Sequence, residues 1–134
     1  LGLPNSLKVE IDFKQNVVLP AKTLSYKNAW KVNTKVNVMD AREICAEKIR
    51  ATAERARYRD FYDLFLLLKK FKFELQEIKA LITQKEIRKP ITNHAIAANW
   101  LVARKERQQE LGRIYYAGGV SDSDVGAMIE RIKI

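Results

Sequence analysis

Residues 43–68 read EICAEKIRATAERARYRDFYDLFLLL, a helix-forming run that combines many basic side chains with an Asp-x-x-Asp pair. The basic residues are Lys48, Arg50, Arg55, Arg57 and Arg59. The carboxylates follow at once, in Asp60-Phe61-Tyr62-Asp63. Basic groups and carboxylates at this density on apolar-backed helices indicate a site that handles phosphate.

The chain on either side of this run is predicted to be mainly helical from Asp40 onward. Asp40 is well placed to cap a first helix, with Glu43 as its capping-box partner, and this helix should extend to about Arg57. Its apolar stripe is Ile44, Cys45, Ile49, Ala53 and Ala56. Further helices are predicted over residues 60–70, over 75–83 and from Thr92 or Asn93 to about Tyr115. A last helix is predicted over 122–132, with Ser121 and Asp124 at its start.

Before Asp40 the pattern changes to the period of two that strands show. Residues 7–13 alternate strictly between apolar and polar side chains and are predicted to form a half-buried strand. The short apolar run 17–19 ends at Pro20, and a polar stretch continues to about Asn28. Residues 30–38 alternate again and are predicted to form another strand.

These elements predict an α+β fold, with two or three N-terminal strands followed by about five helices that form a bundle over one side of the sheet. The expected organisation is a strand region over residues 1–39 and a helical domain over residues 40–134, joined in one compact unit. Because the chain begins with Leu1-Gly2-Leu3-Pro4 and lacks an initiator Met, we also expect it to be part of a longer protein.

Composition narrows the kinds of partner. The chain has 134 residues, a formal net charge of +9 and a pI of about 9.7, a balance that favours nucleic acid, nucleotides or another polyanion. A single cysteine excludes an intramolecular disulfide and argues against a cysteine-based zinc site; Cys45 is expected in the core and His94 at the surface. No apolar run approaches 18 residues and no signal-peptide pattern is present, so we expect a cytoplasmic protein without a membrane partner.

Two carboxylates on the first predicted strand are candidate metal ligands. Glu10 and Asp12 are two residues apart, so both project from the same face of a strand. Oxygen ligands at that spacing could hold a divalent metal ion, although a solvent-exposed polar face has the same pattern.

The basic run offers candidate phosphate ligands. Lys48, Arg55 and Arg59 are spaced by seven and four residues and would stack along one side of a continuous helix. The alternative is a solvated face whose basic groups pair with nearby glutamates on the same helix.

The carboxylate pair has a structural interpretation as well. Asp60 can cap the second helix, and Arg59 and Asp63 form an i,i+4 pair. Asp63 lies in an otherwise apolar helix and needs a partner, so it is expected to orient Lys48 or Arg55.

Taken together, Ala46-Glu47-Lys48-Ile49-Arg50-Ala51, Arg55 and Arg59-Asp60-Phe61-Tyr62-Asp63-Leu64 resemble the late motifs of the AbiEii/AbiGii abortive-infection toxin family. These motifs read roughly A-x-K-x-x-A-x-x-x-R and then R-D-h-x-D-h, where h is an apolar residue. The segment Lys8-Val9-Glu10-Ile11 is similar to the family's h-[DE]-h strand. The resemblance covers about residues 7–68 and implies a nucleotidyltransferase-like sheet, a toxin–antitoxin setting and a role in phage defence.

The resemblance also implies roles for individual residues. Glu10, or otherwise Asp12, would be the third carboxylate of a Mg²⁺ site. Lys48 would contact a nucleoside triphosphate, with Arg55 and Arg59 beside it, and Asp63 with Asp60 would organise the site. The implied activity is transfer of a nucleotide to an RNA or protein acceptor, with a cognate antitoxin as a further partner.

One part of the family pattern is absent from this chain. The first motif, a Gly-Gly or Gly-Ser turn followed by paired Asp residues, should lie upstream of Glu10. Gly118-Gly119 with Asp122 and Asp124 lies at the opposite end and is interpreted as a turn and a helix N-cap. The chain alone is therefore expected to be inactive, and the alternative is a non-catalytic module that binds nucleic acid or an antitoxin.

Overall fold

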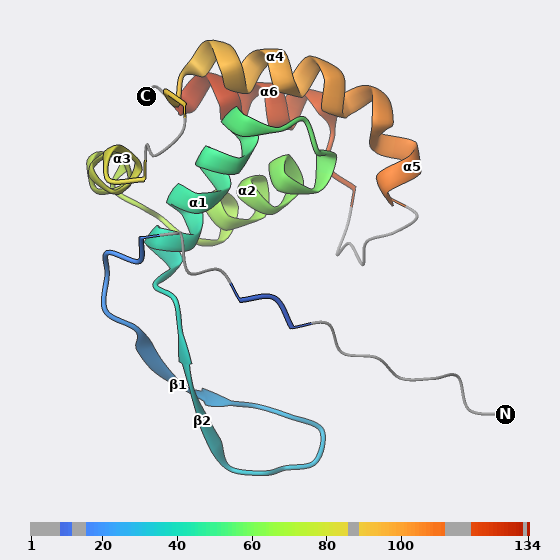
Figure 1. The fold of residues 1–134 in the computed structure, drawn as a ribbon. Coiled ribbons are helices and arrows are strands. Elements are labelled where there is room, and N and C mark those ends of the chain that lie inside the picture. The colour runs from blue at the N-terminus through green and yellow to red at the C-terminus, as the bar shows by residue number, and fades with distance from the viewer. Residues whose placement is uncertain (1–8, 12–15, 86–88, 112–118, 133) are drawn as a thin grey trace, which may run out of the picture.

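The computed structural model describes residues 9–11, 16–85, 89–111, 119–132 and 134, and it has the predicted α+β class (Figure 1). Within these residues, β1 (Lys22–Tyr26) and β2 (Thr34–Val38) form an antiparallel hairpin. The helices that follow are α1 (Ala41–Glu54), α2 (Tyr58–Lys70), α3 (Leu75–Thr83), α4 (Asn93–Ala103), the 3₁₀ turn η1 (Arg104–Glu106), α5 (Arg107–Leu111) and α6 (Asp122–Arg131).

Helix α1 begins where the sequence predicts. The carboxylate of Asp40 accepts a hydrogen bond of 2.9 Å from the backbone N–H of Arg42, which is the N-cap interaction. The same carboxylate forms an ion pair of 2.8 Å with Lys22 of β1. Asp40 therefore both starts α1 and fastens the hairpin to it.

The core is built around α1, which packs against α2, α3 and α4 (Figure 1). Cys45, at the centre of its buried face, is fully buried as predicted. Apolar side chains from every long helix complete this core: Ala46, Ile49, Phe61, Leu64, Ile78, Ile82, Ile96, Trp100, Val125 and Ile129. The Trp100 ring lies 5.2 Å from that of Phe61 and 6.1 Å from that of Tyr58, measured between centroids, so an aromatic cluster joins α4 to α2.

The hairpin extends away from the helices (Figure 1). Its register pairs Lys22 with Val38 and Leu24 with Val36, and every residue of β1 is exposed. The expected strand over residues 30–38 is confirmed in its second half. The polar stretch up to about Asn28, where no strand was predicted, contains β1; only Leu24 and Tyr26 are apolar in this strand, which is too few to give a strand signal.

The predicted strand over residues 7–13 is not supported where the structure describes it. Val9, Glu10 and Ile11 lie outside both strands and are exposed, Val9 by 70% and Ile11 by 71%. Alternation alone does not make a strand; the backbone also needs a neighbour to pair with. The run 17–19 is likewise not a strand in the structure.

Two helices end earlier than predicted. Helix α1 stops at Glu54, because Arg55 adopts an extended backbone with φ −148° and ψ 147°. The helix that Thr92 caps was expected to reach Tyr115, which lies outside the described residues; α4 instead gives way to the 3₁₀ turn after Ala103. The final helix begins with the predicted pair, because Ser121 and Asp124 form a full capping box.

Candidate functional site

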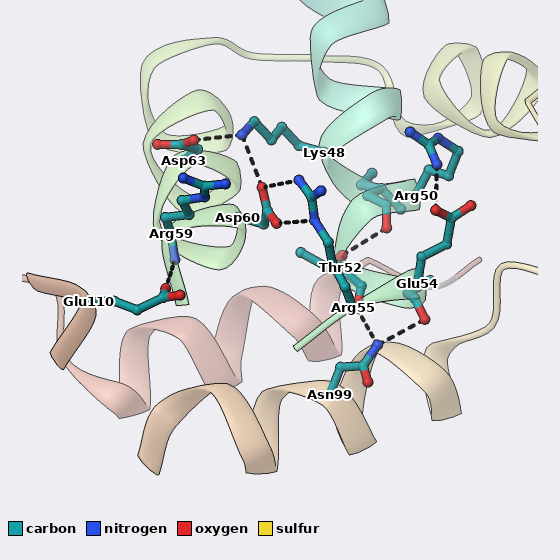
Figure 2. A network of polar contacts seen from close by, with 12 residues as sticks. Lys48, Arg50, Thr52, Glu54, Arg55, Arg59, Asp60, Asp63, Asn99 and Glu110 are labelled. Atoms are coloured by element: carbon teal, nitrogen blue, oxygen red, sulfur yellow. Dashed lines mark hydrogen bonds and ion pairs between the residues drawn. The ribbon is translucent and has the colours of Figure 1, made fainter. Parts of the chain in front are cut away.

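The carboxylate of Asp60 lies at the centre of a polar network between α1 and α2 (Figure 2). Its Oδ1 accepts hydrogen bonds of 3.2 Å from Lys48 Nζ and 3.2 Å from Arg55 Nη2, and its Oδ2 accepts one of 2.7 Å from Arg55 Nε. Arg55 therefore grips both oxygens in the bidentate manner that a guanidinium favours. The structure brings together three of the residues singled out in the sequence.

The break between α1 and α2 creates this arrangement. The predicted stack of Lys48, Arg55 and Arg59 along one helix is wrong, because α1 ends at Glu54 and the chain is extended at Arg55 and Arg57. Arg57 is the N-cap of α2 and makes no side-chain capping bond, so the predicted capping role of Asp60 is also wrong. Asp60 instead lies in the first turn of α2, where the helix dipole favours a carboxylate.

Asn99 of α4 supports the end of α1. Its Nδ2 donates to the backbone oxygens of Thr52 and Ala53, at 2.9 and 2.8 Å (Figure 2). These are carbonyls of the last helical turn, which have no partner within the helix. Asn99 thereby fixes the point from which Arg55 projects. Its role was missed, and no local signal in the sequence would reveal it.

Burial and charge act in opposite directions on Asp60. Its side chain is 1% exposed, and this burial alone would raise its pKa. The hydrogen bonds and positive charges of Arg55 and Lys48 outweigh burial, so the pKa of Asp60 lies below its usual value. Arg55 and Lys48 thus favour the charged form of this carboxylate, which anchors both cations.

Asp63 contacts Lys48 as predicted, with 2.6 Å between Oδ2 and Nζ. Its side chain is 44% exposed and that of Lys48 is 27% exposed, so solvent and small ligands can reach this contact. Arg59 lies one turn before Asp63 on α2, and its backbone N–H donates to Glu110 Oε2 at 3.0 Å. Arg50 turns away from the network and pairs with Glu47 and Glu54, so for this residue the alternative of ion pairs along one helix is confirmed.

A second polar centre, missed in the sequence, surrounds Glu43. Its carboxylate accepts hydrogen bonds of 2.7 Å from the backbone N–H groups of Val18 and Leu19, and it forms an ion pair of 2.8 Å with Lys85. The predicted capping-box role of Glu43 is therefore wrong. The helical phase could have signalled it, because Glu43 precedes the buried Ala46 by three residues and so shares its face.

The metal-binding roles of Glu10 and Asp12 remain predictions. Glu10 lies on the exposed segment 9–11, and Asp12 lies outside the described residues. Across the described ranges, no three His, Cys, Asp or Glu side chains are grouped so that they could hold a metal ion. The part of the chain that the structure describes therefore does not by itself fit a Mg²⁺ centre.

Cys45 lies in the core and His94 at the surface, as the sequence predicts. Burial raises the pKa of the Cys45 thiol to about 12, as befits a core residue, and His94 is exposed in the first turn of α4. Among the helices in the described ranges, none is both long and apolar enough to cross a membrane.

A match to a family model agrees with the motifs around Lys48 and Asp63 and defines the class: a toxin component of a type IV toxin–antitoxin system. The chain belongs to the family described as "Nucleotidyl transferase AbiEii toxin, Type IV TA system", whose model matches residues 2–128. The resemblance seen in the sequence is thereby confirmed. No curated protein and no solved structure matches the chain.

Proposed function

We propose that this protein takes part in the transfer of a nucleotide from a nucleoside triphosphate to an RNA or protein acceptor. In this proposal Lys48 contacts the triphosphate. The observation that carries the proposal is the position of the Lys48 ammonium, held by Asp60 and Asp63 while still accessible. The family description names nucleotidyl transfer, which supports the same role.

The chemistry assigns different tasks to these residues. Nucleotidyl transfer forms a bond between an acceptor oxygen and the α-phosphorus and releases pyrophosphate. A lysine at the triphosphate stabilises the negative charge that develops on the leaving group. Asp60 is too deeply buried to reach a ligand, so it acts as a positioning residue for Lys48 and Arg55. Arg55 and Arg59 are the proposed auxiliary phosphate ligands.

Mg²⁺ is the cofactor that the family resemblance implies. A pair of such ions would neutralise the attacking and leaving oxygens. Glu10, or otherwise Asp12, is the proposed ligand, and the remaining carboxylates would come from the first acidic motif. We expect no transfer by these 134 residues alone, because they lack the family's first acidic motif.

The test is transfer of a labelled nucleotide to RNA and to protein, with the protein expressed from its entire reading frame. Lys48→Ala should reduce the transfer rate by about 100-fold or more, in line with the loss of one charge-stabilising donor. Lys89→Ala is the matched control, because it also removes a lysine charge, from an exposed residue 41 positions after Lys48 in the sequence. Transfer by Lys48→Ala at the wild-type rate would exclude the proposed role.

The hairpin favours a second candidate, a non-catalytic module that binds nucleic acid. Residues 22–38 contain four lysines and no carboxylate, and two aromatic side chains are exposed, Trp30 by 82% and Tyr26 by 53%. Cations beside exposed aromatic rings suit single-stranded nucleic acid. Binding to an RNA oligonucleotide should then weaken steeply with salt, and a lack of binding at low salt would reject this candidate. Tight binding to an acidic antitoxin instead would assign the hairpin to that partner.

A further inference from the structure

A cleft of about 320 Å³ lies between α1 and α2, next to the contact between Lys48 and Asp63. The residues that line it are Ile44, Lys48, Asp63, Leu66, Leu67, Lys70 and Phe71. Most of this lining is apolar, with a few charged groups at the edges, which is the usual character of a small-molecule site. Its size lies near the lower limit of about 300 Å³ for such sites.

The spacing of residues on α2 sets the order of charged and apolar groups along the cleft. On α2, Asp63, Leu67 and Lys70 are spaced by four and three residues, so they lie along one face. A rise of 1.5 Å per residue separates Asp63 from Lys70 by about 10 Å along the axis. The cleft therefore has one charged end at Lys48 and Asp63, an apolar middle at Leu67, and a second cation at the far end.

Contacts around Phe71 hold this far end in place. The Nζ of Lys70 lies 5.4 Å from the centroid of the Phe71 ring, a cation–π contact. The Phe71 ring also stacks with the ring of Phe73, at 5.4 Å between centroids. Lys70 is exposed, and its ammonium lies over the ring of Phe71 at this end of the cleft.

We infer that this cleft binds the nucleoside part of the triphosphate, with the base against Leu67 and Phe71 and with Lys70 as a residue that determines base specificity. The inference rests on the proposed function, because it places the phosphates at Lys48. An ammonium group only donates hydrogen bonds, so Lys70 accepts a base edge that presents a carbonyl oxygen or ring nitrogen and disfavours an exocyclic amino group.

Calorimetric titration with the four ribonucleoside triphosphates and with inorganic tripolyphosphate tests this inference, using the protein expressed from its entire reading frame. Tripolyphosphate reports the phosphate contacts alone, since it has no sugar or base. The variant is Lys70→Met, which keeps the aliphatic stem and removes the charge. Lys69→Met is the matched control, because Lys69 precedes Lys70 on α2 and lies over Phe65 instead, outside this cleft.

The preferred nucleoside triphosphate should bind at least about tenfold more tightly than tripolyphosphate, because its base would bury apolar surface against Leu67 and Phe71. Lys70→Met should weaken that binding about three- to tenfold and narrow the differences among the four bases, while tripolyphosphate binding stays unchanged. Lys69→Met should resemble wild type for every ligand.

The outcomes separate this inference from the proposed function. Equal binding of tripolyphosphate and all four nucleotides, or equal effects of Lys70→Met and Lys69→Met, would overturn the base site and leave the role of Lys48 intact. If Lys48→Ala binds both kinds of ligand as tightly as wild type, or if wild type binds neither, the triphosphate site itself fails and the base site fails with it.

Discussion

The Lys85 ammonium and the Glu43 carboxylate lie 2.8 Å apart, with side chains that are only 1% and 0% exposed. The same ammonium donates to Asn16 O and pairs with Glu47, each at 2.8 Å. The backbone N–H groups of Val18 and Leu19 donate to the same carboxylate. A buried pair this well satisfied holds segment 16–19, α1 and the end of α3 together.

Glu43→Gln should destabilise the fold by about 3 kcal/mol, at the low end of the cost of leaving a buried charge without its partner. The loss of stability stays near the low end of this range because Glu47 still pairs with Lys85 in the variant. Chemical denaturation monitored by circular dichroism measures it. Glu77→Gln is the control: its ion pair with Arg42 is long, at 3.4 Å, and Glu77 is 53% exposed, so it should change the stability by less than about 1 kcal/mol. A Glu43→Gln protein as stable as Glu77→Gln would contradict this account.

The centre around Glu43 also predicts how the stability of the fold changes in acid. Burial alone would raise the pKa of Glu43, but Lys85 and the N–H groups of Val18 and Leu19 outweigh it and hold the pKa below the ordinary value of 4.5. A carboxyl whose folded pKa is depressed stabilises the fold above its unfolded pKa and loses that contribution as the pH falls through the folded pKa. The free energy of unfolding should therefore decline as the pH drops below about 4.5. A series of denaturation curves in this range should show a shallower decline for Glu43→Gln; parallel profiles would refute the assignment.

Asp60 and Asp63 both bind Lys48, yet their substitution should have different effects. Asp60→Asn leaves Lys48 and Arg55 without their buried counter-charge and should cost about 3 kcal/mol, at the low end because both cations are partly exposed. Asp63→Asn removes a partner that is 44% exposed and should cost less than about 1 kcal/mol. Thermal unfolding of the two variants side by side tests the difference. Equal losses would show that Asp60 is not the anchor of the network.

Cys45 should be unreactive in the native protein. Its thiol is fully buried, and burial raises its pKa to about 12, so almost no thiolate is present at pH 8. Ellman's reagent should therefore modify Cys45 only as fast as the protein opens, and at once in denaturant. Since it is the single cysteine, the signal needs no assignment. Rapid stoichiometric labelling of the native protein would argue against the packing of α1.

The sequence was most informative where local signals agree with tertiary packing. Asp40, Thr92 and Ser121 were recognisable as helix caps because their side chains act on backbone groups a few residues away. The contact between Asp63 and Lys48 was foreseen because a carboxylate in an apolar helix needs a counter-charge.

Long-range partners were beyond reach of the same reasoning. Glu43 looked like a capping residue, but its real partners lie more than 20 residues away in both directions, at Leu19 and Lys85. Asp60 looked like a cap for the same reason, and only the end of α1 at Glu54 turns Arg55 toward it. The alternation over residues 7–13 met the local condition for a strand, but pairing with a neighbour is a property of the whole fold.

The length of the junction between α1 and α2, residues 55–57, limits which changes this chain can accept. Successive residues of a helix are rotated by about 100° around its axis. Losing or gaining one junction residue would shift the angular phase of α2 and carry Asp60 off the side that meets Lys48. Substitutions at Arg57, whose side chain makes no capping bond, leave this phase untouched. The contact between Asp60 and Lys48 thus depends on the number of residues between the two helices as much as on which residues they are.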